Sequence, residues 1–384
     1  MKIRDFGVEI WMNRYENDCA FNLAETCVES LTIAELLEIA GREPGDVMQE
    51  MLSLKMTYGD IEGSHRLRSL VAGLHEKQKA ENVVITHGTI GANALVHQTL
   101  VERGGRVISV LPTYQQHYSI PESIGADVQI LKLRPENGFL PDLAELRRLA
   151  VPRTKLIAIN NPNNPTGALM NRTMLEEIVE IARSCDAWLL SDEVYRGTDQ
   201  SGSGSTEAIA DLYEKGISTG GMSKAYSLAG LRLGWIVGPR ALLDAVSIHR
   251  DYNTISVGML DDLFAAIALE NSATILERSQ RITRTNLAIL SDWVDGEPLI
   301  SWIKPQSGTT ALLKYDLPMA SEPFCIRLLE RTGVMLTPGS AMDMEGHLRI
   351  GYTNSESILR EGLSLLSGFL AEEQAPAVGM RRLG

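Results

Sequence analysis

Long apolar runs, paired cysteines and basic tracts are all missing from this 384-residue sequence. No stretch of about 18 apolar residues occurs, so we expect no transmembrane helix, and the first residues lack the apolar segment of a signal peptide. The four cysteines are scattered, without a CxxC pair or a histidine spacing typical of zinc sites. We therefore expect no bound metal, reduced thiols and a cytoplasmic location.

Positive charge is also scarce. The 36 lysine and arginine residues are outnumbered by 49 aspartate and glutamate residues, which gives a formal net charge of −13. Because no basic tract could neutralise phosphates, the sequence argues against a nucleic-acid partner. The chain is long enough for one large domain and a smaller one.

Short apolar runs alternate with helix-length amphipathic segments between about residues 82 and 240. This alternation predicts an α/β fold with a mostly parallel sheet covered by helices on both faces. The expected helices include residues 90–102 and 171–184. The expected strands are residues 82–86, 106–110, 128–132, 156–160, 187–191, 216–219 and 235–237.

The chain changes character after about residue 242 and indicates a smaller α+β region. Residues 375–384 are expected to form a loose tail. The helices expected in this region are residues 242–252, 260–269, 273–293 and 355–373, and the strands are residues 309–314 and 347–350.

Candidate site residues follow four of the expected strands, at the ends where parallel sheets bind their ligands. They are Gly88, Asn164, Asp192 and Lys224. With Arg232, eight residues after Lys224, they supply an amine for a Schiff base, an acid for a pyridine nitrogen, donors for a phenolic oxygen and a cation for phosphate. Pyridoxal phosphate requires these four things of a protein.

Chemical roles follow for Lys224 and Asp192, and for Asn164 together with Tyr195. Lys224 can condense with an aldehyde only if some of it is uncharged, so we expect its surroundings to lower its pKa. Asp192 ends a buried strand and would pair with a protonated pyridine nitrogen, although a helix N-cap would also explain it. Asn164 and Tyr195 would donate to the phenolic oxygen, although turn chemistry alone would account for the asparagine-rich motif.

The phosphate would lie where Gly88, Thr89 and Ile90 begin a helix, because the first N–H groups of a helix are unpaired. Arg232 would add charge and Ser223 a hydroxyl donor. As a motif, this helix start is common in proteins and weak by itself.

Three further residues have both a structural and a functional interpretation. Tyr58 could donate to phosphate or be a packed turn tyrosine. Tyr114 could stack on the pyridine ring or be a core aromatic. Arg349 lies inside an apolar strand and should bind a carboxylate, either of the substrate or of a structural ion pair.

These motifs resemble the class I/II aminotransferases, which are fold type I pyridoxal-phosphate enzymes. The resemblance runs from about residue 57 to 368 and is strongest in residues 161–167, 192–195 and 223–235. It implies the cofactor pyridoxal 5′-phosphate, a large mostly parallel-sheet domain between helices, and a smaller α+β domain. It also implies a homodimer with shared active sites, in which Tyr58 reaches the neighbour's phosphate.

The resemblance divides the chain into residues 1–45, which join the small domain, residues 46–265 as the large cofactor domain, and residues 266–384 as the small domain. It implies the roles already given for Asp192, Asn164, Tyr195 and Arg232 in binding the cofactor. It adds that Lys224 carries the proton between the substrate Cα and the cofactor C4′. Arg349 then binds the substrate carboxylate.

Two departures from the family pattern matter. Gly221 stands where the family usually has a phosphate-binding serine, so Thr89 or water would have to replace that hydroxyl. Residues 21–27 lack the family's glycines and, with residues 250–254, resemble the capreomycidine synthase subgroup, which cyclises a hydroxylated arginine. Glu25 could therefore face a cationic substrate side chain, or be a solvated acid.

The expected function is transamination between an α-amino acid and a 2-oxo acid, in amino acid metabolism. The alternative is a pyridoxal-phosphate-dependent lyase or cyclase, which eliminates a β or γ substituent or cyclises an arginine-type substrate. A ligand-sensing module of a transcription regulator is a third interpretation, but such proteins carry a DNA-binding domain ahead of this fold.

Overall fold

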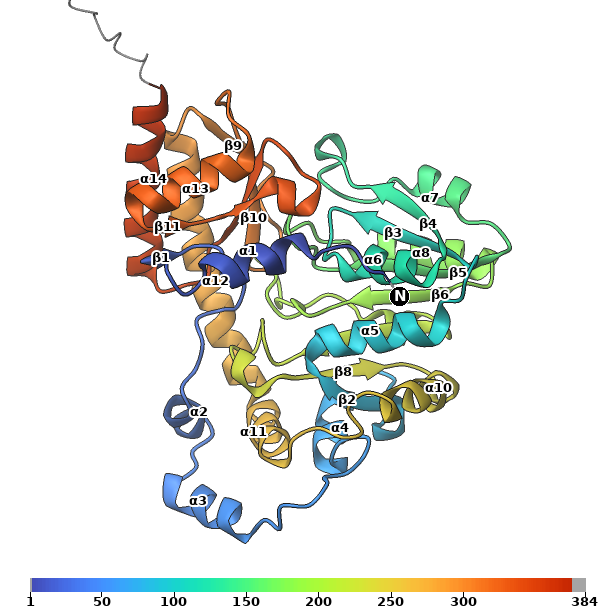
Figure 1. Ribbon diagram of the computed structural model, residues 1–384. Helices are drawn as coiled ribbons and strands as arrows, with labels where there is room; N and C mark the ends of the chain where they lie inside the picture. The colour runs from blue at the N-terminus through green and yellow to red at the C-terminus, as the bar shows by residue number, and fades with distance from the viewer. Residues whose placement is uncertain (1, 375–384) are drawn as a thin grey trace, which may run out of the picture.

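A seven-stranded sheet forms the centre of the computed structural model, which describes residues 2–374 (Figure 1). The strand order is β2-β8-β7-β6-β5-β3-β4, and β8 runs antiparallel to β2 and β7, whereas the other neighbours are parallel. The predicted mostly parallel sheet is confirmed. Its strands are β2 (Val83–His87), β3 (Arg106–Leu111), β4 (Asp127–Lys132), β5 (Thr154–Asn160), β6 (Trp188–Asp192), β7 (Gly216–Gly221) and β8 (Leu233–Val237).

Apolar cores cover both faces of this sheet, because successive strand residues point in opposite directions. Val107 belongs to one core, together with Val96 of α5, and the adjacent Ile108 belongs to another, together with Ile178 of α8. The helices of this half are α4 (His65–Ala72), α5 (Gly88–Leu100), α6 (Gln116–Ile124), α7 (Leu143–Leu149), α8 (Arg172–Ser184), α9 (Ile209–Leu212), α10 (Arg240–Asp251) and α11 (Met259–Glu270).

A second, four-stranded antiparallel sheet lies beside the first, in the order β12-β13-β10-β9. The long helix α12 runs from the lower part of the molecule up to this sheet (Figure 1). The elements of this half are β9 (Ile300–Trp302), β10 (Thr310–Tyr315), β12 (Thr337–Pro338), β13 (His347–Gly351), α12 (Ser272–Gly296), α13 (Ser321–Thr332) and α14 (Glu356–Gln374). Short 3-10 helices occur at η1 (Ala80–Asn82), η2 (Pro135–Asn137), η3 (Ala229–Leu231) and η4 (Gly339–Met342).

The N-terminal segment packs against this second half. Strand β1 (Phe21–Asn22) pairs in parallel with β11 (Val334–Met335). Trp11 of α1 (Gly7–Tyr15) donates from Nε1 to the Leu336 carbonyl at 2.9 Å. These contacts hold α1 between the two sheets (Figure 1).

Two further helices of the N-terminal segment, α2 (Ile33–Ile39) and α3 (Pro44–Ser53), lie at the lower left of Figure 1, away from the sheets. The domain boundaries given above stay a prediction, and the tail from residue 375 lies outside the described residues. Within residues 2–374, no helix is long and apolar enough to span a bilayer.

Candidate active site

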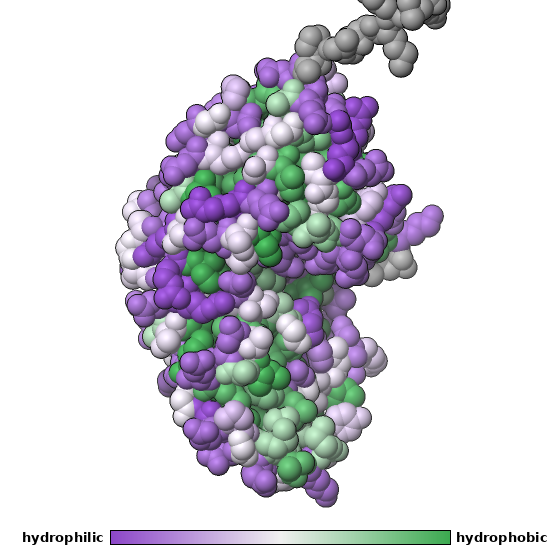
Figure 2. Space-filling model, turned by 90° about the vertical axis from the view of Figure 1, so that its left-hand side faces the viewer, coloured by the Kyte–Doolittle hydropathy of each residue, from purple (hydrophilic) through white to green (hydrophobic). Residues whose placement is uncertain are grey.

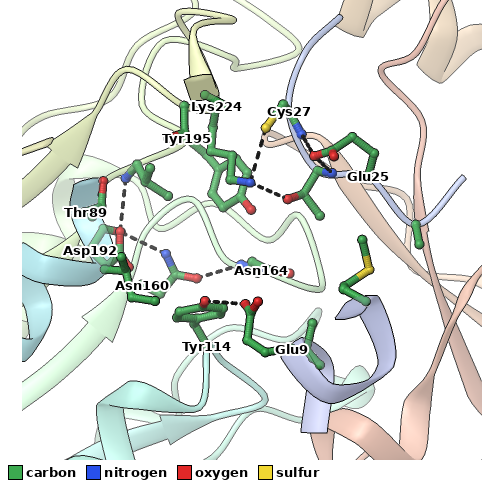
Figure 3. Close-up of a pocket in the computed structure, with 18 of the residues that line it drawn as sticks. Glu9, Glu25, Cys27, Thr89, Tyr114, Asn160, Asn164, Asp192, Tyr195 and Lys224 are labelled. Atoms are coloured by element: carbon green, nitrogen blue, oxygen red, sulfur yellow. Dashed lines mark hydrogen bonds between the residues drawn. The ribbon is translucent and has the colours of Figure 1, made fainter. Parts of the chain in front are cut away.

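A cavity of about 360 Å³ opens at the carboxyl ends of the parallel strands, between the two sheets (Figure 3). Gly88 lies just outside its lining, and Tyr58 lies elsewhere with its side chain 74% exposed. All other residues that the sequence proposed for the site line this cavity: Glu25, Thr89, Ile90, Tyr114, Asn164, Asp192, Tyr195, Ser223, Lys224, Arg232 and Arg349.

Asp192 is held at the end of β6 by contacts from two other elements. Its Oδ2 accepts from Asn93 Nδ2 at 2.8 Å and lies 3.3 Å from His117 Nε2. Behind it, His117 Nδ1 lies 3.3 Å from Nε2 of the buried His97, whose pKa is lowered well below its usual value by burial and by His117. No helix begins at Asp192, so the N-cap alternative is wrong.

Asn160 joins the ends of β5 and β6 beneath the cavity (Figure 3). Its Nδ2 donates to the Asp192 carbonyl at 2.8 Å, and its Oδ1 accepts from the backbone N–H of Asn164 at 2.7 Å. The sequence predicts a strand that includes Asn160 but indicates no role for its side chain. Asn160 fixes Asn164 at the cavity wall beside Asp192.

Arg349 enters the cavity from β13 of the second sheet. Its side chain is 3% exposed, and Nη2 donates to the Ala24 carbonyl at 3.2 Å and to Thr337 Oγ1 at 3.1 Å. Nη1 donates to Asn164 Oδ1 at 3.4 Å, while Nε has no partner among the described residues. Burial lowers the pKa of this arginine. The described chain gives it no carboxylate, which favours an anionic ligand over the structural ion pair.

Lys224 lies in the turn that follows β7 and points into the cavity (Figure 3). Its Nζ donates to Thr26 Oγ1 at 2.6 Å and to Cys27 Sγ at 3.4 Å. Burial lowers the pKa of Lys224, but Cys27, Tyr195 and Glu25 outweigh it and raise the pKa overall. Burial raises the pKa of Cys27 to about 11, so Glu25 carries the negative charge at neutral pH. The expected lowering of the Lys224 pKa is therefore wrong for the protein's own side chains.

A cradle for an oxyanion forms where β2 passes into α5. Gly88 has a φ of 66°, and a Cβ there would lie 3.2 Å from Arg232 Nη2, so glycine allows the guanidinium to approach. Thr89 Oγ1 is buried without a partner among the described residues. A Cβ at Gly221 would lie 2.5 Å from this oxygen. The Thr89 hydroxyl thus fills the space in which the side chain of a serine at position 221 would begin.

This cradle fits a phosphate group. It combines the free N–H groups at the start of α5 with an unpartnered hydroxyl and a guanidinium, and these are donors that a phosphate dianion accepts. The acid at the strand end and the lysine lie in the same cavity. The side chains present therefore suit pyridoxal phosphate.

Helix α1 forms a wall of the cavity that the sequence analysis missed. Val8, Glu9, Met12 and Glu16 all line it. The Tyr114 hydroxyl donates to Glu9 Oε1 at 2.6 Å (Figure 3). No local signal marks these residues, because a nine-residue helix with apolar and acidic side chains is ordinary.

Glu25 lies in the cavity wall, only partly exposed. Its Oε1 accepts from the backbone N–H groups of Thr26 at 2.7 Å and Cys27 at 2.9 Å. Burial opposes ionisation, but Lys224 and these N–H groups lower the pKa of Glu25 overall. The alternative of a fully solvated acid is wrong.

The fold and this set of side chains define a pyridoxal-phosphate-dependent enzyme of the aminotransferase class, with a lysine, an acid and a carboxylate-binding arginine in one cavity. Residues 32–365 match the family model of aminotransferase class I and II, and the chain belongs to that family. Its cofactor is pyridoxal phosphate, and its substrates are an amino acid and a 2-oxo acid.

Three known proteins illustrate the similarity. A pyridoxal-phosphate-dependent aminotransferase from Streptococcus suis 89-1591 superposes with a TM-score of 0.95 and 43% identity, over 98% of this chain and 100% of that one. Capreomycidine synthase of Streptomyces vinaceus is 30% identical over 94% of this chain and 92% of its own length. An arginine–pyruvate transaminase of Pseudomonas aeruginosa is 29% identical over 85% of each chain.

Proposed function

We propose that Lys224 binds pyridoxal phosphate as a Schiff base and that the enzyme transfers the amino group of an α-amino acid to a 2-oxo acid. The observation that carries this proposal is the shared cavity of Lys224, Asp192 and Arg349. One of these side chains is a nucleophile, one is an acid, and one is a buried cation without a carboxylate partner among residues 2–374.

The cofactor, when bound, supplies a protonated pyridine ring that draws electrons from the substrate Cα. Asp192, held by Asn93 and His117, would keep the proton on the pyridine nitrogen. Asn164 and Tyr195 donate to the phenolic oxygen.

Once the substrate amine has displaced Lys224 from the cofactor, the freed lysine amine would remove the proton from the substrate Cα and deliver it to the cofactor C4′. Arg349 orients the substrate by its carboxylate. The Tyr114 ring would lie against the pyridine face. The hydrogen bond from its hydroxyl to Glu9 supports this role, because it fixes the ring in the cavity wall.

The residues at the start of α5 would bind the phosphate. Gly88, Thr89 and Ile90 supply backbone and hydroxyl donors, and Ser223 and Arg232 add a hydroxyl and a charge. The unpartnered Thr89 hydroxyl beside Gly221 supports Thr89 as the replacement for the family's serine.

The active unit is a homodimer in which Tyr58 donates to the partner's phosphate. Apolar side chains gather in the lower part of Figure 2, and several large ones around α3 are more than half exposed, namely Met48 (52%), Leu52 (72%) and Met56 (73%). Light scattering across a concentration series tests the dimer. A monomer at all micromolar concentrations would contradict it. The cytoplasmic location stays a prediction.

The direct test is to incubate the enzyme with single amino acids and a 2-oxo acid acceptor and to measure the new 2-oxo acid. We expect Lys224→Ala to abolish it and Lys304→Ala, an exposed lysine outside the cavity, to leave it unchanged. The second candidate function is that of a cyclase, which the similarity to capreomycidine synthase supports. A cyclic product formed without any 2-oxo acceptor would favour the cyclase.

A further inference from the structure

We propose that the substrate is an amino acid with a cationic side chain, and that Glu9, Glu16 and Glu25 bind this cation. The proposal rests on the proposed function, because it takes the ligand of the cavity to be an amino acid. It identifies the chemical class of the substrate and the residues that select it.

The three carboxylates come from two segments that the fold brings together. Glu9 and Glu16 lie on and just after α1, Glu25 follows β1, and all three line the cavity that contains Lys224. Burial raises the pKa of Glu16, and the adjacent Glu25 carboxylate raises it further. The ion pairs among residues 2–374 include none of the three.

A separate observation shows that this cavity is built for a ligand. Arg349 lines the cavity and is only 3% exposed. Its Nε has no hydrogen-bond partner among the described residues. A carboxylate satisfies such a guanidinium. The cavity therefore has a cationic end and an acidic wall, and its complement is a ligand with a carboxylate and a separate cation.

Lys224 makes no direct ion pair with the acids, although its charge favours the ionised form of Glu25. Lys224 donates to the Thr26 hydroxyl and the Cys27 sulfur, and neither acceptor is a carboxylate. A neutral side chain that displaced water from the acids would leave them desolvated without a partner, which is unfavourable. A guanidinium or ammonium group would offset that cost.

Two of the acids are already oriented for binding. Glu9 accepts from the Tyr114 hydroxyl at 2.6 Å, and Glu25 accepts from two backbone N–H groups at 2.7 and 2.9 Å. These contacts fix one oxygen of each carboxylate and leave the other for a ligand. Fixed carboxylates discriminate better than mobile ones, because less side-chain freedom is lost on binding.

The test is calorimetric binding of matched acids to the holoenzyme. The probes are 5-guanidinopentanoate, 6-(dimethylamino)hexanoate and the neutral 5-ureidopentanoate, none of which has a primary amine to react with the cofactor. We expect at least one cationic acid to bind about tenfold or more tightly than the ureido acid, since hydrogen bonds to charged groups are the stronger ones. Equal or absent binding of both cationic acids would overturn the proposal.

Variants assign the effect to the acids. Glu16→Gln and Glu25→Gln should each weaken binding of the cationic acid about tenfold and change that of the ureido acid less than about twofold. Asp18→Asn, an exposed acid outside the cavity, should change neither. Retention of full selectivity in both glutamine variants, with unchanged melting curves, would contradict the assignment.

The outcome separates this proposal from the proposed function. Binding is measured without turnover, so selective binding with no transamination of any amino acid would remove the transaminase and keep the cation site. Transamination of neutral amino acids together with unselective binding would remove the cation site and keep the transaminase.

Discussion

Replacing Arg349 by methionine tests the substrate-binding end of the cavity. Methionine keeps much of the volume and removes the guanidinium. In the structure this guanidinium is 3% exposed, donates to Ala24, Thr337 and Asn164, and has no carboxylate partner among the described residues. A substrate carboxylate bound there would be almost fully desolvated.

The expected loss follows from that burial. Truncating one member of a buried charged pair costs about 2–5 kcal/mol, and about 1.4 kcal/mol corresponds to tenfold. We therefore expect kcat/KM for the amino acid substrate to fall about 30- to 5000-fold. Stability should change little, because the three lost hydrogen bonds, at about 1 kcal/mol each, are offset by relief of a desolvated charge.

The assay compares kcat/KM for the amino acid with the thermal unfolding of each variant. Lys314→Met, which removes an exposed cation from neighbouring strand β10, is the matched control and should retain activity. An Arg349→Met enzyme with undiminished kcat/KM would refute the reasoning. A large fall in melting temperature would show that the arginine is structural instead.

Two further predictions concern residues of the site, and a third concerns Asp211, which lies outside the cavity. Thr89→Val should weaken pyridoxal phosphate binding about tenfold or more in a titration of the apoenzyme, because a hydroxyl donor to phosphate is lost; Thr89→Ser should restore it, and equal affinities would contradict the role. His117→Phe should lower kcat more than it raises KM and shift the pH profile of the cofactor spectrum, because Asp192 loses a contact; an unchanged profile would contradict this. Burial raises the pKa of Asp211, but His75 and neighbouring N–H groups outweigh it and lower the pKa below 3.8. The ionised Asp211 carboxylate therefore stabilises the folded protein above pH 3.8, and this stabilisation is lost as the pH falls. Asp211→Asn should have a lower melting temperature than the unchanged protein at pH 7. A difference in melting temperature that does not become smaller towards pH 3 would contradict this.

The positions of the strand-end residues could be predicted from the sequence. Asn164, Asp192 and Lys224 each follow a short apolar run, and parallel strands bring their carboxyl ends to one edge. The structure brings all three into one cavity. Local patterns sufficed here because burial of a strand on both faces leaves a strong signal.

The acidic wall could not be predicted in the same way. Glu9 and Glu16 reach the cavity because Trp11 is hydrogen-bonded to Leu336 and β1 pairs with β11, and both partners lie more than 300 residues further along the chain. The contact between His117 and Asp192 spans 75 residues and likewise has no local signature. The direction of the Lys224 pKa shift depended on Glu25, whose position relative to the lysine only the fold determines.

Reduction of the purified holoenzyme with borohydride, followed by peptide mass spectrometry, tests the central claim most directly. Borohydride converts a Schiff base into a stable secondary amine and so marks the lysine that bound the cofactor. We predict the pyridoxyl label on Lys224 and its absence from Lys224→Ala. A label on another lysine, or none after addition of pyridoxal phosphate, would contradict the account.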